Sequence, residues 1–399
     1  MLEYAGSHRA GLRARRGDAV ETLAVVRRTD WLLFGAVVAV VGLGLWGIEG
    51  ITRHDVAGNS RYFVERQAIY AAIGFVGLVA TTLIDPDLYR RYWRVIFGGT
   101  IGAIVLVYLQ GQVVRGSRRW IDIGFFKFQP SEFGKLLFVL ALAGFLAERS
   151  RRVNQVDTML ATIGLACIPI ALVFLQPDIG TALVYTAALA AVLFVAGTRW
   201  THLAAAATVA LVGVLAVLWL LPAAGVHVLK PYQQSRLTGF THPTSDPAGS
   251  TYNINQSIVA VASGQVRGRG IEGATQTNLD FLPEHATDFV FASYGEQRGF
   301  AGASLLLGLY LLVIWRGLRI VTVARDMFSA VVAGGIVIAL LFQIFVNVGM
   351  TMGIAPITGI PLPFVSVGGS SMIANLCAMG VLLAIHGRAR GGRVPSRRR

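Results

Sequence analysis

Residues 31–49 read WLLFGAVVAVVGLGLWGIE, and the only charged side chain in this run is its last one, Glu49. As an α-helix, a run of this length crosses the hydrocarbon core of a bilayer, which is about 30 Å thick. Comparable runs recur at 67–84, 95–110, 132–147, 159–175, 179–196, 202–221, 290–315, 328–351 and 368–386. The sequence therefore predicts an all-α integral membrane protein with about ten transmembrane helices.

The composition supports this fold class. Hydrophobic residues make up 54% of the 399 residues, charged residues 14%, and the mean hydropathy is +0.61. A soluble domain carries nearly twice that charge, so a very apolar soluble helical protein fits poorly. The net charge of +14 would suggest a nucleic-acid partner in a soluble protein, but Lys and Arg gather at span ends in membrane proteins. We expect membrane lipid, and no nucleic acid, as a partner.

The positions of the apolar runs divide the chain into a basic N-terminal segment (1–30), a membrane domain (31–386) and a basic tail (387–399). One long polar loop, residues 222–289, lies between spans seven and eight. The positive-inside rule places both termini and the 148–158 loop in the cytoplasm and the long loop outside. Within that loop, residues 252–261 predict a short amphipathic helix on the membrane surface. The inner segments then hold Arg27, Arg28, Arg90, Arg91, Arg94, Arg149, Arg151, Arg152, Arg199, Arg316, Arg319 and Arg325.

The second outer loop, residues 111–131, opposes this charge rule. It is short, yet it carries Arg115, Arg118, Arg119 and Lys127. The charges are either harmless at the membrane interface or part of a surface that binds a phosphate-bearing substrate, because guanidinium groups bind phosphate with two hydrogen bonds. We favour the binding surface.

Asp288 is the main candidate for chemistry. It lies where the long loop re-enters the membrane, just after Glu284 and His285. Burying a carboxylate at that depth costs free energy, so such a residue normally has a function or an ion-pair partner. Partial burial would raise its pKa toward that of a general base. The alternative is a helix cap, in which Thr287 or Asp288 caps span eight.

A second candidate group begins span four. Glu132 and Lys135 are three residues apart in a helix, so they share a face and can form an ion pair at the outer mouth of the span. Asp178, in the turn between spans five and six, either belongs to the site or caps span six. The segment 356–371 is rich in Pro and Gly, and such irregular backbone at membrane depth is tolerated only against protein or a wet cavity.

The sequence contains no Walker loop, dinucleotide fingerprint, HExxH motif or paired-Cys metal motif, so it predicts no metal-ligand set. A carboxylate base, a Glu–Lys pair and a basic loop on one face suit a different chemistry. They suit a substrate on a phosphorylated lipid anchor that reacts with a hydroxyl nucleophile.

Five strings, in order, resemble the SEDS family (shape, elongation, division and sporulation). They are GSRRWI at 116–121, FQPSE at 128–132 with Lys135, QPDIGT at 176–181, the LPE…TDF block of 282–289, and GIPLPF at 359–364 with GGSS at 368–371. Three further motifs are more similar to those of the elongation branch than to those of the division branch. They are NVGM at 347–350, PITGI at 356–360 and TQTNLDF at 275–281. Three positions depart from the family pattern. Ala286 stands in a usual His position, Gln297 in a Glu position and Val367 in an aromatic position, and the first departure puts a role for His285 in doubt.

The resemblance implies a peptidoglycan glycosyltransferase, a hexosyltransferase that joins lipid II units into β-1,4 glycan strands at the outer face of the bacterial cytoplasmic membrane. In this scheme Asp288 is the base, Glu132 and Lys135 order the catalytic cavity, and Arg118 and Arg119 hold pyrophosphate. A divalent cation, magnesium or manganese, could assist. A class B penicillin-binding protein, a transpeptidase, is the expected partner. Further substrate-binding candidates are Gln129, Ser131, Asp178, Glu284 and Ser370.

Two other functions fit the composition. A lipid II flippase or transporter would place its ionisable residues near the middle of the bilayer, whereas these candidates cluster at outer span ends. A non-catalytic scaffold for the transpeptidase would tolerate the loss of Asp288.

Overall fold

The structure, a computed structural model, describes residues 27–56, 58–114, 117–122, 124, 126–226 and 251–391, without the side chains of 112–118. Within these residues ten apolar helices follow the ten predicted spans. Nine are long and apolar enough to cross a membrane, if α9 is taken with its continuation to Ala223, and the shorter Ile179–Val195 is the tenth. The expected all-α membrane fold is confirmed. The helices are α2 (Trp31–Ile51), α3 (Tyr62–Leu83), α5 (Trp93–Gln110), α6 (Pro130–Glu148), α7 (Val156–Leu175), α8 (Ile179–Val195), α9 (Trp200–Leu215), α14 (Val290–Val323), α15 (Met327–Thr351) and α16 (Gly369–Arg390).

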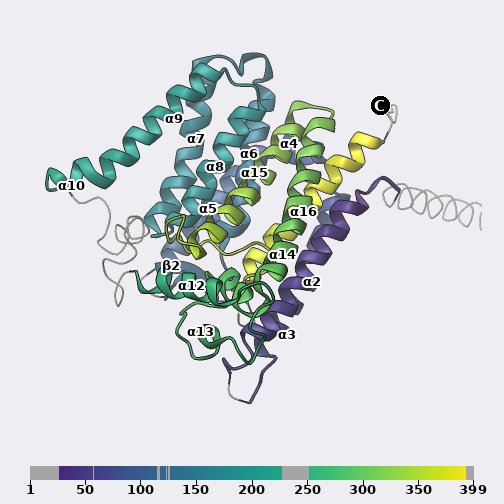
Figure 1. The fold of residues 1–399 in the computed structure, drawn as a ribbon. Helices are drawn as coiled ribbons and strands as arrows, with labels where there is room; N and C mark the ends of the chain where they lie inside the picture. The colour runs from purple at the N-terminus through teal and green to yellow at the C-terminus, as the bar shows by residue number, and fades with distance from the viewer. Residues whose placement is uncertain are drawn as a thin grey trace, which may run out of the picture.

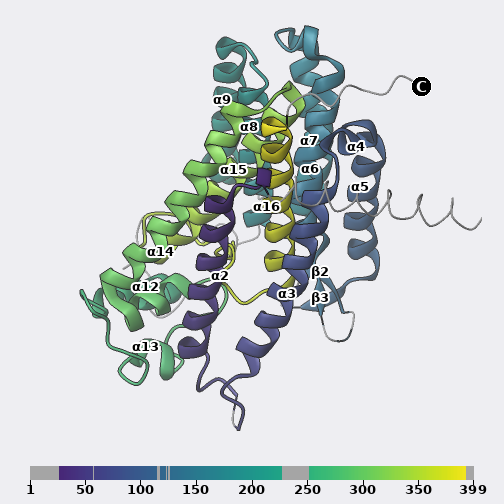
Figure 2. The same cartoon turned by 90° about the vertical axis from the view of Figure 1, so that its right-hand side faces the viewer.

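The centre of the bundle is formed by α6, α15 and α16 (Figures 1 and 2). Their apolar side chains are mostly buried, whereas those of α9 are not buried at all. Helix α9 continues through a wider turn, η2 (Ala216–Leu220), into α10 (Leu221–Ala223), and the whole rod leans away from the bundle in Figure 1. Helix α16 packs closely along α3 because small residues face the contact: a methyl group at Gly74 would lie 2.5 Å from Leu376.

The two ends of the bundle differ. One end, which we call the terminal end, holds the start of α2, the end of α16 and the short helices α4 (Pro86–Arg91) and η1 (Ser150–Arg152). The other end, the loop end, holds a small antiparallel sheet of β1 (Gln112–Val114), β2 (Ser117–Asp122) and β3 (Lys127–Phe128), in the order β1-β2-β3. This sheet lies in residues 111–131, the predicted second outer loop, and the sequence did not predict its strands.

Residues 251–289 of the long loop also lie at the loop end. They contain α12 (Tyr252–Ser263), which confirms the helix predicted at 252–261, and α13 (Thr275–Asn278). The buried side chains of α12 pack in a separate hydrophobic cluster with Leu282, Phe289 and Ile357. The apolar face of α12 therefore covers protein, and its place on a membrane surface stays a prediction.

Helix α14 is broken near its start, which the prediction of one span at 290–315 missed. Gly299 has φ +65° and ψ −169°, a conformation that glycine adopts without a steric penalty. Four backbone hydrogen bonds to the preceding loop bridge the break. They run from Phe300 to Gln265 (2.7 Å), Ala301 to Val266 (3.0 Å), Arg269 to Glu296 (2.9 Å) and Gly270 to Gln297 (3.1 Å).

The fully buried Glu296 fixes the loop further. Its carboxylate accepts hydrogen bonds from the backbone N–H groups of Gln276 (2.9 Å) and Thr277 (3.1 Å) and from the Thr277 hydroxyl (2.8 Å). These donors lie in the first turn of α13, where a negative charge is stabilised. The long loop and the first turns of α14 are thus one packed unit, and Asp288 is part of it.

Candidate functional site

Asp288 lies two residues before α14, half-buried at the loop end. Phe289 holds the N-cap position of α14, so neither Thr287 nor Asp288, the two predicted caps, occupies it. The Asp288 carbonyl accepts a hydrogen bond from the Asn347 side chain (2.8 Å). Its carboxylate lies over Gly359, where an added methyl group would come within 3.3 Å of Oδ2. Gly359 has φ +69°, so the chain passes beneath the carboxylate without a side chain.

Helix α15 connects Asp288 to the buried ion pair. Asn347 also donates to the Ile360 carbonyl (2.8 Å), and Gln343, one turn earlier, accepts from Lys135 Nζ (2.7 Å). Residues four apart lie on one face of a helix, about 6 Å apart along its axis. Gln343 and Asn347 therefore place Lys135 and the Asp288 segment one helical turn apart.

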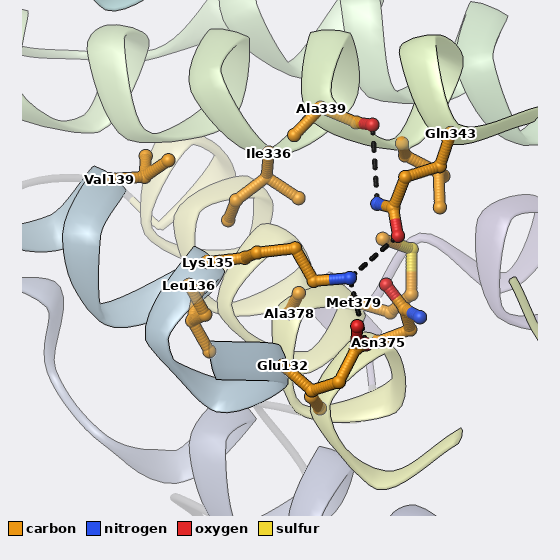
Figure 3. Close-up of a pocket in the computed structure, with 12 residues that line it drawn as sticks. Glu132, Lys135, Leu136, Val139, Ile336, Ala339, Gln343, Asn375, Ala378 and Met379 are labelled. Carbon is orange, nitrogen blue, oxygen red and sulfur yellow. Dashed lines mark hydrogen bonds and ion pairs between the residues drawn. The ribbon is translucent and has the colours of Figure 1, made fainter. Parts of the chain in front are cut away.

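The Glu132–Lys135 pair predicted from the spacing is present. Lys135 Nζ lies 2.7 Å from Glu132 Oε2, and both residues are buried, with 8% and 3% of their surface exposed (Figure 3). They line a cavity of about 20 Å³ together with Gln343 and Asn375, and a cavity of this size holds about one water molecule. Such a buried pair requires both partners, because the removal of one leaves an uncompensated charge.

Arg119 is the one predicted phosphate ligand whose side chain the structure describes. Its guanidinium donates to the carbonyls of Gln176 (3.2 Å) and Pro177, and its Nη1 lies 3.7 Å from Asp178 Oδ1. Arg119 thus ties the small sheet to the turn between α7 and α8. The side chain of Arg118, and all of Arg115, lie outside the described residues.

The other candidates of this loop form one hydrogen-bond network. Asp178 caps α8 by accepting a hydrogen bond from the Thr181 N–H (3.2 Å), which is one of its two predicted roles. It also accepts a hydrogen bond from Gln129 Nε2 (3.3 Å). The Gln129 N–H donates to Ser370 Oγ (2.8 Å), whose hydroxyl donates to the Lys127 carbonyl (2.9 Å). The network therefore joins β3, α8 and the start of α16.

Ser131 is held from two sides. Its hydroxyl accepts from Gln129 Nε2 (3.2 Å), and its carbonyl accepts from the buried Tyr185 hydroxyl (3.1 Å). The Pro- and Gly-rich segment 356–364 links this network to Asp288. A methyl group at Gly180 would lie 2.5 Å from the Thr358 carbonyl, the residue before Gly359. The segment packs against protein, in agreement with the prediction for irregular backbone.

Glu284 and His285 stabilise the loop segment that leads to Asp288. Glu284 accepts a hydrogen bond from the Thr287 hydroxyl (2.8 Å). His285 Nε2 lies 3.1 Å from both carboxylate oxygens of Asp55, in the loop between α2 and α3, and Nδ1 lies 3.2 Å from the Leu282 carbonyl. Burial lowers the pKa of His285, but the hydrogen bond and charge of Asp55 outweigh it and hold that pKa above its usual value.

Asp55, Asp280 and His285 are the only described group of three acidic or His side chains close enough to share an ion, with ligand atoms within 4.8 Å of one another. The set does not fit a bound metal well. Both ring nitrogens of His285 already have partners, and the side chain of Asp280 is 85% exposed. The group is explained as an ionic link between two loops.

Sequence reasoning missed Gln343, Asn347 and Asp55 as members of the site. A signal existed for the first two, since they are the only side-chain amides in an otherwise apolar span and are four residues apart. No such signal existed for Asp55, because its partner His285 is 230 residues away in the sequence.

Known proteins resemble the chain over nearly its whole length. The peptidoglycan glycosyltransferase MrdB of Escherichia coli K12 is 35% identical over 358 residues, which cover 90% of this chain and 92% of that protein. The peptidoglycan glycosyltransferase RodA of Treponema pallidum is 32% identical, with 90% and 98% covered. Bacillus subtilis stage V sporulation protein E is 35% identical over 330 residues, with 82% and 87% covered.

Solved structures are also similar to this chain. A chain from a study of the structural coordination of polymerization and crosslinking by a peptidoglycan synthase complex matches with a TM-score of 0.76 and 29% identity, covering 91% of this chain and 99% of that chain. Thermus thermophilus rod shape determining protein RodA matches with a TM-score of 0.68 and 27% identity, covering 91% and 98%. Residues 27–391 match the cell cycle protein family that groups FtsW, RodA and SpoVE, and the chain belongs to this family.

Proposed function

We propose that the protein is a peptidoglycan glycosyltransferase that joins lipid II units into β-1,4 glycan strands during cell-wall elongation. The names of the relatives support this activity, and the matched RodA structure supports the elongation branch. The observation that carries the mechanism is the placement of the half-buried Asp288. Its backbone carbonyl is bound by Asn347, one helical turn along α15 from Gln343, which binds Lys135 of the buried Glu132–Lys135 pair, and its carboxylate lies over Gly359.

In the proposed reaction, Asp288 removes the proton of the GlcNAc 4-hydroxyl of the acceptor. That oxygen forms a bond to the anomeric carbon of the donor, and the bond from this carbon to the lipid pyrophosphate breaks. One displacement inverts the anomeric carbon and gives a β-1,4 linkage. Pyrophosphate leaves as an anion, so positive groups aimed at it lower the barrier.

The basic loop supplies these groups in the proposal. Arg118 and Arg119 hold the pyrophosphate, and Arg119 exchanges its contacts with the 176–178 turn for the phosphate oxygens. Glu132 and Lys135 set the charge and shape of the cavity beneath. Gln129, Ser131, Asp178, Glu284 and Ser370 position the loops around the substrate. Any divalent cation, magnesium or manganese, would be held largely by substrate phosphate, as Mg²⁺ commonly is.

The cellular setting is part of the same proposal. The protein lies in the bacterial cytoplasmic membrane with its terminal end in the cytoplasm and its loop end outside, where lipid II is polymerised. A class B penicillin-binding protein is the proposed partner. The match to a chain of a peptidoglycan synthase complex supports such an assembly.

Replacement of Asp288 by Asn tests the mechanism, with Asp280→Asn as a matched control in the same loop. A general base contributes about 10² to 10⁴-fold, so Asp288→Asn should slow glycan formation from purified lipid II by that factor. Lipid II binding and expression should stay near parental values, and Asp280→Asn should polymerise normally because its side chain is exposed. Parental polymerisation by Asp288→Asn would overturn the mechanism and leave the flippase and scaffold functions.

A further inference from the structure

The terminal end of the bundle holds a cleft of about 510 Å³, at the opposite end from the loop that carries Asp288. It lies between the start of α2, the junction of α3 and α4, the turn between α14 and α15, and the last turns of α16. Three guanidinium groups line it, those of Arg28, Arg325 and Arg388, together with a single carboxylate, Asp85. No step of the proposed polymerisation uses this cleft.

The positive charge of the cleft is only partly neutralised. Arg388 pairs with Asp85 (3.0 Å) and with Asp87. Arg325 donates to the carbonyls of Ala389 (3.1 Å) and Gly391, which are uncharged acceptors. Arg28 makes no ion pair or side-chain hydrogen bond with any described residue. Two guanidinium groups thus face the cleft without a carboxylate partner among the described residues.

The end of α16 would by itself repel an anion, because the last carbonyls of a helix carry partial negative charge. Arg325 covers these carbonyls, so an anion that enters the cleft meets guanidinium groups instead. Guanidinium groups match a phosphate in shape and charge. The cleft therefore suits a phosphate group.

The remaining lining is mostly apolar, with Thr29 and Thr82 as its two hydroxyl-bearing residues. Leu83, Ile84 and Leu383 line the cleft, and 62% of the Leu83 surface is exposed. Leu83 is also the last residue of α3, a helix long and apolar enough to span the membrane, so the cleft opens at the depth of lipid headgroups. A soluble phosphate would need no such apolar wall, whereas the acyl chains of a phospholipid would lie along it.

We propose that this cleft binds one anionic phospholipid of the leaflet opposite the candidate site. Its phosphate lies between Arg28 and Arg325, and its acyl chains follow the exposed apolar side of α3 that ends at Leu83. The lipid contacts α2, α3 and α16 at the terminal end. This inference does not depend on the proposed reaction at Asp288.

Native mass spectrometry of the purified full chain, with dioleoylphosphatidylglycerol titrated into the micelles, tests the proposal. One lipid should bind saturably, and dioleoylphosphatidylcholine should not replace it. Arg28→Gln should weaken binding about fivefold and Arg28→Glu roughly 30-fold, since one charge near a membrane surface is worth ~1 kcal/mol. Arg28 has no described partner to lose, so neither change should disturb the fold.

The neighbouring Arg27 provides the matched control, because it is exposed and does not line the cleft. Arg27→Gln and Arg27→Glu should change lipid binding by less than about twofold, since they alter charge outside the cleft. Equal weakening by the Arg27 and Arg28 variants would show general surface attraction and overturn the proposal. Displacement of the lipid by inorganic phosphate at modest concentration would assign the cleft to a soluble anion and overturn it as well.

Discussion

The Glu132–Lys135 pair should behave as one unit in a double-mutant cycle. The changes are Glu132→Gln, Lys135→Met and both together. Lys135 Nζ donates hydrogen bonds to Glu132 Oε2 and Gln343 Oε1, each at 2.7 Å. In Glu132→Gln the ammonium keeps only uncharged partners, and in Lys135→Met the carboxylate loses its counter-charge.

The magnitude follows from distance and burial. At 2.7 Å and an effective dielectric constant of ~20, the Coulomb attraction is about 6 kcal/mol, before the cost of removing the charges from water. Breaking a buried pair from one side costs about 3–5 kcal/mol, whereas removing both partners is often nearly neutral. The coupling energy should therefore be at least about 3 kcal/mol.

The assay is reversible unfolding of the purified protein in mixed detergent micelles, with glycan formation measured on the same samples. Arg94 and Glu148 provide a matched pair, because their atoms lie 2.8 Å apart but their side chains are 69% and 42% exposed. That exposed pair should show a coupling of only about 0.2–1 kcal/mol. If the buried pair couples no more strongly than Arg94 and Glu148, the proposed dependence of each buried charge on the other is wrong.

Three further outcomes are expected. Gly359→Ala should reduce polymerisation about tenfold or more while the protein stays folded, since the new methyl group strains a residue with φ +69° and pushes on Asp288; a parental rate in the lipid II assay would contradict this. The raised pKa of His285 means that its link to Asp55 stabilises the fold fully below about pH 6.5 and weakens as pH rises through the folded pKa. Melting temperature should fall over that range in the parent and stay flatter in His285→Gln. A Cys at position 150, made by Ser150→Cys in a cysteine-free background, should resist an impermeant maleimide in intact cells, and labelling would reverse the proposed orientation.

The sequence predicted the features that depend on near neighbours. A transmembrane span can be predicted from a long apolar run alone, and all ten predicted runs are helices in the structure. The Glu132–Lys135 contact needs only a three-residue spacing within a helix, and the cap at Asp178 needs only its place before one. Asp288 does not hold the N-cap position that its alternative role required, because the α14 helix begins one residue later than that role requires.

Features that depend on distant parts of the chain were not predicted. Arg119 contacts a turn more than 50 residues away, and nothing in its own loop indicates that partner. The strands of that loop are two to six residues long, too short for an alternating pattern to identify them. The break at Gly299 looked like an ordinary glycine in a span, because the loop that satisfies its backbone lies some 30 residues earlier.

The break at Gly299 also has a mechanical consequence. Backbone hydrogen bonds join the preceding loop to both sides of the break. Arg269 and Gly270 donate to Glu296 and Gln297, and Phe300 and Ala301, the first residues of the rod that continues to Val323, donate to Gln265 and Val266. The break is therefore a fixed bend, and a tilt of the rod carries the loop and the first segment of α14 along. Asp288 lies on the loop side of this bend, where Asn347 binds its backbone carbonyl. Changes in membrane thickness that tilt the rod are therefore transmitted to the segment that holds the carboxylate.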